Sequence, residues 1–153
     1  MIEEELQKAG SYALRFLSYR PRSEFEMRSR LRRKFTNEVV NIIVENLKDR
    51  GLLDDIAFAS VWTHNRMSHH PRSASMVAKE LFQKGVSRDV AGEAVRDLDD
   101  EESAYKAGQK SYDRKAQEEH GAYRRRIWGY LQRRGFNASV ISRVPNRLWE
   151  ERP

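Results

Sequence analysis

The residues with the most obvious chemical potential in this chain are its histidines and its acidic runs. His69 and His70 are adjacent, and adjacent side chains rarely converge on one metal ion. No carboxylate stands at ligand spacing from them on a shared helix face, and the chain has no cysteine. We therefore expect exposed histidines and no metal site. The four histidines are His64, His69, His70 and His120.

Two acidic runs, Asp54-Asp55 and Asp99 to Glu102, could hold a divalent cation. Helix capping and first-turn carboxylates explain both runs more simply. The sequence also lacks GxxxxGK[ST], GxGxxG and GxSxG, so it offers neither a nucleotide-binding loop nor a nucleophile elbow. We expect no cofactor, no catalytic residue and no enzymatic activity.

The basic residues are clustered, and they point to binding rather than catalysis. The chain has 29 Lys and Arg against 23 Asp and Glu, a formal net charge of +6. One basic group lies between Arg15 and Lys34, a second comprises Arg124 to Arg126 with Arg133 and Arg134, and Asp97 to Glu102 is acidic. The clusters indicate a polyanionic partner, either nucleic acid or an acidic protein surface. Solvated helix faces remain the alternative interpretation.

Composition restricts the class of protein. Only 39% of the 153 residues are apolar and 34% are charged, which is typical of thin helical layers rather than one thick core. The absence of cysteine suits a reducing compartment. The N-terminus is acidic and lacks the order of a secretory signal, and no apolar run reaches membrane-spanning length. We expect a cytoplasmic protein without a membrane segment.

An internal repeat of about fifty residues organises the chain. Pro21-Arg22-Ser23 is matched by Pro71-Arg72-Ser73, and Leu81 to Ser87 is matched by Leu131 to Asn137. Leu31 and Lys34 fit the same frame, although Phe35 follows Lys34 with no glycine between them. A repeat of this length indicates one supersecondary unit used several times.

Each repeat predicts three helices. In the first repeat, apolar residues recur at helical spacing from Leu6 to Leu17, and Ser23 with Glu26 forms a capping box for the second helix. Thr36 caps a third helix, and Gly51 can end it. The joint between second and third helices recurs with Gly85 and Gly135, each followed by a capping residue, Ser87 or Asn137.

The connections between repeats carry further expectations. Leu52 and Leu53 should be buried beneath a turn, and Asp54 or Asp55 should cap the next helix. That helix carries the apolar residues Ile56, Phe58, Ala59 and Trp62 and ends near Arg66. Pro145 should shorten the last helix, with Leu148 and Trp149 packing back as a terminal cap. We predict an all-α protein of nine helices in three modules, residues 1–53, 54–99 and 100–153.

A three-helix unit with a short turn also suggests helix-turn-helix DNA binding. The best candidate is Arg22 to Leu47, with Asn37 to Arg50 as the recognition helix. That helix is nearly charge-neutral, and the basic residues lie on the preceding helix. A reader of major-groove base edges normally presents basic or amide side chains. The sequence therefore favours nonspecific backbone contact over sequence-specific recognition.

The chain resembles the RecX family of recombination regulators. The likeness is carried by Arg22-Ser23-Glu24, by Gly51 to Asp55 with Phe58-Ala59, by Glu80-Leu81 with Lys84-Gly85-Val86, and by Arg133 to Phe136. The family pattern has a glycine after Lys34 that is absent here. The resemblance implies three tandem three-helix modules in a curved, elongated array. It also implies a non-catalytic modulator that binds the RecA filament on DNA and limits its extension, ATP turnover and strand exchange.

Charge clustering, rather than the family motif, supplies candidate contact residues. Two other functions stay open: direct, largely nonspecific nucleic-acid binding by basic helical modules, and a helical adaptor for an unknown acidic partner. We expect a monomer. The candidate partner-binding residues are Arg22, Arg28, Arg32, Arg33, Arg72, Lys79, Arg124, Arg125 and Arg126.

Overall fold

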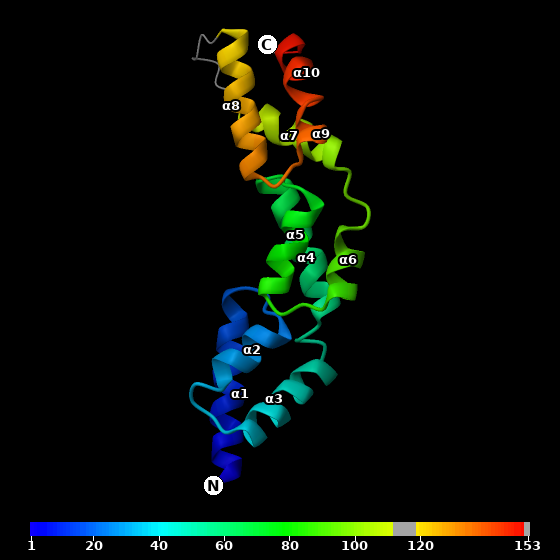
Figure 1. Ribbon diagram of the computed structural model, residues 1–153. Coiled ribbons are helices and arrows are strands. Elements are labelled where there is room, and N and C mark those ends of the chain that lie inside the picture. Colours follow the sequence, from blue (N-terminus) through cyan, green and yellow to red (C-terminus); the bar gives the residue numbers. More distant parts are fainter. Residues whose placement is uncertain (112–118, 152–153) are drawn as a thin grey trace. The chain divides into compact units, whose positions relative to one another are not determined.

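The protein is described by a computed structural model covering residues 1–111 and 119–151. Within those ranges the regular elements are all helices, with no strand (Figure 1). The helices are α1 (Ile2–Tyr19), α2 (Glu24–Leu31), α3 (Asn37–Asp49), α4 (Asp55–His69), α5 (Ala74–Gln83), α6 (Arg88–Val95), α7 (Asp100–Lys110), α8 (His120–Arg133), α9 (Ala138–Ile141) and α10 (Val144–Glu150).

These helices form the three expected three-helix modules, α1 to α3, α4 to α6 and α7 to α10. The ninth expected helix is divided into α9 and α10. Val144 is buried at the start of α10, and Pro145 occupies its first turn, where a missing N–H costs no hydrogen bond. The predicted boundaries at residues 53/54 and 99/100 stay predictions.

Local capping follows the sequence closely. The Ser23 hydroxyl accepts a hydrogen bond from the Glu26 N–H while the Glu26 carboxylate accepts from the Ser23 N–H, which completes the capping box. Thr36 and Asn137 cap α3 and α9 as predicted. Asp54 rather than Asp55 caps α4, accepting from the N–H groups two and three residues ahead.

By compactness, the chain divides into two units, residues 1–62 with 80–91 and residues 63–79 with 92–153. The first unit has a core between α1, α2 and α3, in which Ala9 and Ala13 let α1 approach closely. The largest fully buried side chains of this core are Met27, Leu31, Val39, Val40 and Val44. The second unit has its own core from α7 to α10, with Ile127, Leu131 and Ile141 fully buried.

Inside the first unit, the first module is joined to the second at the N-terminus of α2. The Ser23 hydroxyl donates to the Lys84 carbonyl at 2.6 Å, and the Glu24 N–H donates to Asp55 Oδ1 at 2.9 Å. Gly85 has φ +78°, and a Cβ there would lie 2.2 Å from Phe25 Cβ. Only glycine therefore fits this joint.

Inside the second unit, an equivalent joint connects the second module to the third. The Ser73 N–H donates to the Arg134 carbonyl at 3.0 Å, and the Ala74 N–H donates to Asp100 Oδ1 at 2.9 Å. Gly135 has φ +89°, and a Cβ there would lie 2.6 Å from Ser73 Oγ. The two acidic pairs, Asp54-Asp55 and Asp99-Asp100, have the same arrangement. The first aspartate caps its own helix, and the second accepts a backbone hydrogen bond from the preceding module.

Three expectations about the first connection are wrong. Leu53 is buried, but Leu52 is 41% exposed, because it follows Gly51 on the outer side of the turn. Of the apolar residues expected on α4, Phe58 and Ala59 are buried, whereas Ile56 is 70% exposed. Helix α4 also continues beyond Arg66 to His69, where the Lys110 ammonium donates to the Ser68 carbonyl at 2.6 Å and supplies a cation to the helix C-terminus.

No helix among the described residues combines the length and the apolar composition that crossing a membrane requires.

Candidate interaction surface

Cations on the α3-facing side of α2 are neutralised. Arg28 Nε lies 3.1 Å from Glu24 Oε1, its Nη2 lies 3.7 Å from Glu45 Oε1, and its Nη1 donates to Asn41 at 2.7 Å. Lys48 contacts the same two carboxylates, at 3.5 and 3.7 Å. Although Arg28 is one of the predicted contact residues, its charge is committed to holding α2 against α3.

A second ion-pair network surrounds Glu26 at the joint. Arg20 forms a two-pronged ion pair with Glu26, and Lys84 Nζ lies 3.7 Å from the same carboxylate. Burial alone would raise the pKa of Glu26. The hydrogen bonds from Arg20 and from the Ser23 N–H, with the charges of Arg20 and Lys84, outweigh burial and lower that pKa.

The neighbouring Asp55 carboxylate shows the opposite balance. Burial is the main cause that raises the pKa of Asp55, and the charges of Glu24 and Asp54 act in the same direction. The hydrogen bond from the Glu24 N–H and the charge of Lys48 oppose them without cancelling them. In the joint, Asp55 accepts the hydrogen bond from the Glu24 N–H.

Three cations beside the Tyr12 and Phe16 rings have no carboxylate partner among the described residues: Arg22 precedes α2, Arg30 lies on it and Lys34 follows it. Arg22 lies over the Phe16 ring, with 3.8 Å from its Cζ to the centroid, and Arg30 lies between the Phe16 and Tyr12 rings at 5.2 and 5.9 Å. Lys34 Nζ is 4.8 Å from the Tyr12 centroid. We call Arg22, Arg30 and Lys34 the cation row; in the described part of the chain, none of the three forms an ion pair.

The cation row is held in place by hydrogen bonds as well as rings. Arg22 Nε donates to the Phe16 carbonyl at 3.2 Å, and Arg30 Nε donates to the Tyr12 hydroxyl at 2.8 Å. Burial first, and then the charge of Arg20, lowers the pKa of Arg22; Arg30 acts in the same direction and Glu26 opposes them. The positive charges are thus close enough to repel one another.

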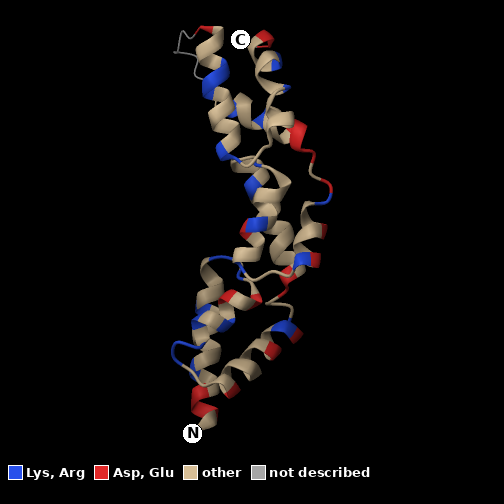
Figure 2. Cartoon of the chain, viewed as in Figure 1, with Lys and Arg blue, Asp and Glu red and all other residues tan. Residues whose placement is uncertain are grey.

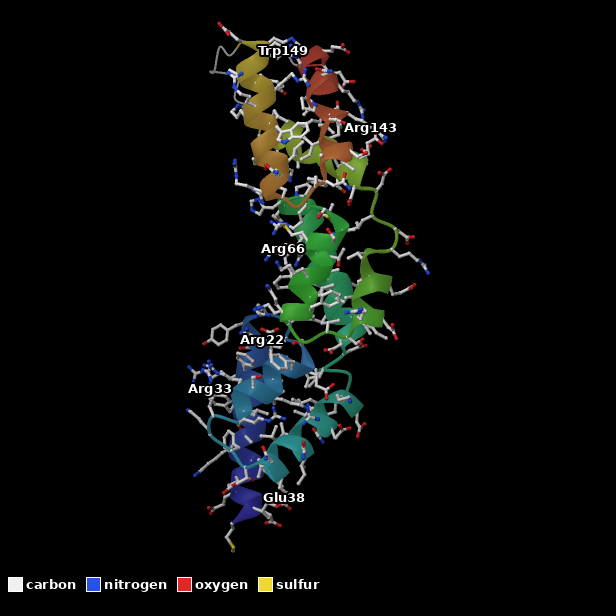
Figure 3. The ribbon with its side chains drawn as sticks, viewed as in Figure 1. Arg22, Arg33, Glu38, Arg66, Arg143 and Trp149 are labelled. Carbon is white, nitrogen blue, oxygen red and sulfur yellow. The ribbon has the colours of Figure 1, made fainter. Side chains whose placement is uncertain are left out.

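The predicted contact residues Arg32 and Arg33 lie beside this row in the α2–α3 turn. Both side chains are exposed and, within the described residues, neither forms an ion pair or a hydrogen bond. Figure 2 shows this turn in blue, the colour of Lys and Arg, and Figure 3 shows Arg33 on the side away from α3. Five cations therefore share one region of the first unit.

The α3 helix does not offer a basic recognition surface. Glu38 lies in its first turn, and Lys48 near its end is paired with carboxylates. Acidic groups near phosphates would disfavour insertion of this helix into a major groove, and the expectation against sequence-specific reading stays a prediction.

The remaining predicted residues lie in the second unit and divide into two groups. Lys79, Arg124 and Arg125 are exposed. Arg72 and Arg126 are half-buried and bonded to backbone: Arg72 Nε donates to the His70 carbonyl at 2.9 Å, and Arg126 Nη1 donates to the Ser111 carbonyl at 3.0 Å. The structure does not place these residues relative to those of the first unit.

Sequence reasoning left Arg30 and Lys34 out of the candidate contact residues. A signal was available, because Arg30 and Lys34 stand four residues apart, which on a continuous helix would place them on one face; in the structure α2 ends at Leu31 and Lys34 lies in the turn that follows. Their aromatic partners Tyr12 and Phe16 show the same spacing on α1. What the pattern could not give is that these two faces meet.

These features define a class of protein that is built of tandem three-helix modules with cations on the surface. Among residues 1–111 and 119–151, no group of three acidic or histidine side chains is arranged to hold a metal ion. Three family profiles match the chain: the RecX first three-helix domain over residues 9–56, the second over 54–95 and the third over 99–144. The chain belongs to the RecX family.

Similar proteins agree with this assignment. Regulatory protein RecX of Prosthecochloris aestuarii is 31% identical over 97% of this chain and 98% of its own length. Regulatory protein RecX of Chlorobium limicola is 28% identical over 100% of this chain and 97% of its own length. The crystal structure of RecX from Lactobacillus salivarius, 20% identical, has the same fold with a TM-score of 0.78, over 97% of this chain and 99% of that one.

Proposed function

We propose that this protein is a regulator that binds the RecA recombinase filament on DNA. By doing so it limits filament extension, ATP turnover and strand exchange in recombination and repair. Membership in a family whose curated relatives are named regulatory proteins supports the proposal. The family resemblance supplies RecA as the partner, and we propose a cytoplasmic monomer that acts by binding rather than by catalysis.

The structural observation that carries the proposal is the separation of paired from unpaired cations. Arg28, Lys48 and Lys84 are bound to carboxylates, whereas Arg32 and Arg33 are exposed. A filament presents the same acidic loops and phosphates at every repeat. Several individually weak charged contacts can therefore add through multivalency.

We propose two sets of contact residues, one from each unit. In the first unit they are Arg22, Arg32 and Arg33, and in the second unit Lys79, Arg124 and Arg125. Arg28, Arg72 and Arg126 are also candidates from the sequence, but their bonds to Glu24, to the His70 carbonyl and to the Ser111 carbonyl must break before they can bind a partner. We expect these three to contribute less.

The decisive experiment is a titration of RecA ATPase with this protein while DNA is in large excess. We expect ATP turnover to fall with the ratio of this protein to RecA and to stay insensitive to additional DNA. If inhibition instead follows only the fraction of DNA that the protein sequesters, the proposal fails. A pulldown with preformed filaments at moderate salt provides an independent readout.

A second candidate function is direct, nonspecific nucleic-acid binding, which the unpaired cations also favour. It requires affinity for free DNA that falls steeply with salt, because each neutralised phosphate releases counterions. A protein that binds neither RecA filaments nor DNA would support a helical adaptor for another acidic partner.

A further inference from the structure

The joint between the first and second modules, here called the first joint, contains a carboxylate that bridges them. Glu26, in the first turn of α2, binds Arg20 of its own module and lies 3.7 Å from Lys84 Nζ of the second module. Only 13% of the Glu26 side chain is exposed, so water and salt screen this bridge weakly. The first joint is therefore held by charge as well as by hydrogen bonds.

The second joint, between the second and third modules, lacks that carboxylate. In the fifty-residue repeat Met76 stands at the position of Glu26, and Arg134 stands at the position of Lys84. The Met76 side chain lies at the joint, because a Cβ at Gly135 would be 2.9 Å from Met76 Cβ and 3.5 Å from its Cε. The cation is thus retained in the second joint, whereas its anionic partner is replaced by a thioether, which cannot form an ion pair.

The cations around the second joint repel one another. His70 occupies the position of Arg20 in the repeat, and partial loss of hydration, followed by the like charges of its neighbours, lowers its pKa. Those neighbours are Arg134, Arg72, Lys110 and His69. Lys110 also donates to the Ser68 carbonyl across the joint at 2.6 Å, but its exposed side chain adds to the same positive charge. The second joint therefore has hydrogen bonds without a carboxylate bridge.

The missing acid also changes which group of the N-cap serine crosses the joint. In the first joint Glu26 accepts from the Ser23 N–H, and the Ser23 hydroxyl donates to a carbonyl of the second module at 2.6 Å. In the second joint Met76 offers no such acceptor, and the Ser73 N–H itself donates to the Arg134 carbonyl at 3.0 Å. One carboxylate thus completes the capping box and bridges the modules, so its replacement removes two interactions together.

We infer that the second joint is the place at which this chain opens, because it lacks the carboxylate that holds the first joint closed. The third module parts from the second while the first and second modules stay joined. Local opening of this kind occurs where a structure has the fewest stabilising interactions. It gives a chain of three modules one preferred point of bending. Opening requires no partner, so it can be measured whether or not the protein regulates RecA.

Two backbone amides report on the two joints separately. Glu24 and Ala74 are the first residues of α2 and α5, and the first N–H groups of a helix have no acceptor within that helix. Each donates across its joint instead, Glu24 to Asp55 and Ala74 to Asp100, in both cases at 2.9 Å. Exchange of these two amides with deuterium therefore measures opening of the joints rather than fraying of the helices.

In the wild-type protein we expect Ala74 to exchange faster than Glu24, after correction for intrinsic rates. The difference should be about three- to tenfold, the range for one half-exposed charged interaction. Exchange is followed residue by residue by NMR on the full chain at neutral pH and low salt. Equal protection of the two amides, or stronger protection of Ala74, would overturn the inference.

Exchanging the two side chains tests the assigned cause. Met76→Glu should slow exchange at Ala74 by about three- to tenfold and leave Glu24 unchanged, because a carboxylate at this position can bridge to Arg134. Glu26→Met should accelerate Glu24 and leave Ala74 unchanged. An effect of Met76→Glu on both amides, or on neither, would contradict the assigned cause. If Met76→Glu does not fold, the wild-type comparison and Glu26→Met still decide.

The control for Met76→Glu is Gln132→Glu, at an exposed position near the end of α8. It adds the same charge to the chain without replacing the side chain at the joint. Exchange at Ala74 should stay at the wild-type rate, because an exposed carboxylate is well screened by water. If Gln132→Glu protects Ala74 as much as Met76→Glu does, net charge rather than a bridge controls the joint, and the inference fails.

Discussion

At the scale of single residues, Glu26 has more than one structural role in the joint between the first and second modules. Its carboxylate completes the capping box of α2 and also binds Arg20 and Lys84. Only 13% of its side chain is exposed, so these interactions are weakly screened. Arg20 is 37% exposed, which reduces what the pair contributes to stability.

Replacing Glu26 with Gln should lower the free energy of unfolding by about 1 to 2 kcal/mol at neutral pH, because charged hydrogen bonds become neutral ones. Since the folded-state pKa of Glu26 is lowered, its stabilisation is complete above the ordinary glutamate pKa and is lost as pH falls through the lowered value. Urea unfolding of both proteins from neutral to acidic pH measures this difference.

The control for this prediction is Glu93→Gln. Glu93 pairs with Arg96 at 2.8 Å, but both side chains are about two-thirds exposed, at 65% and 66%. An exposed pair contributes little, so this substitution should hardly change stability at any pH. A Glu26→Gln deficit that stays constant between neutral and acidic pH would contradict the role assigned to the charge.

Residue types alone could not separate the paired cations from the unpaired ones. Arg28, Arg32 and Arg33 lie within six residues and were equally good candidates in the sequence. Glu24 stands four residues before Arg28 and gives a local signal for one ion pair. The other partners, Glu45 and Asn41, reach Arg28 only after α3 folds back on α2. Chain-distant partners of this kind carry no local signal.

At the scale of elements, the glycine turns show which structural requirements can be predicted from local sequence and which depend on residues far away in the chain. The sequence predicted that Gly51, Gly85 and Gly135 end helices, and all three have positive φ. The second requirement on Gly85, close approach to Phe25, was not predictable because these residues are sixty positions apart. The turn after Lys34, which has Phe35 in place of the glycine, needs no such conformation, because no non-glycine residue among those described has positive φ.

Gly85→Ala and Gly51→Ala should therefore differ in their cost. Both place a side chain at positive φ, for about 1 to 2 kcal/mol. Nothing lies within 4 Å of a Cβ at Gly51, whereas a Cβ at Gly85 would meet Phe25 Cβ at 2.2 Å and Cγ at 2.4 Å. Overpacking adds about 1 to 3 kcal/mol, so Gly85→Ala should be clearly the more destabilising in urea unfolding. Equal losses would show that the approach to Phe25 is unimportant.

At the scale of the whole molecule, the three modules are related but their ends differ. The position of the joint serines Ser23 and Ser73 is occupied in the third module by Tyr123. Helix α8 begins earlier, at His120, and its N-cap residue Glu119 makes no side-chain capping bond. Tyr123 is buried, and its ring lies 5.1 Å from the Trp149 ring. Where another module would attach, the chain places α10.

The predicted terminal cap is thus present, and its sequence signal was the pair of large apolar residues after Pro145. Leu148 is buried against Gly108, where any Cβ would meet Leu148 Cδ1 at 2.3 Å. In repeat proteins an apolar face that no neighbouring unit covers has to be covered from within the unit itself. The chain's own residues supply that cover.

Trp149→Ala should consequently destabilise the third module while leaving the first joint intact. Trp149 is half-buried and contacts both His120 at 4.9 Å and Tyr123, so truncation should cost about 1 to 3 kcal/mol, less than for a fully buried tryptophan. Amide hydrogen exchange should accelerate in α7, α8 and α10 and remain unchanged in α1 to α3, because the first unit has its own core. Uniform acceleration throughout the chain would mean that Trp149 supports the whole molecule, and unchanged exchange in α8 would mean that it is no cap.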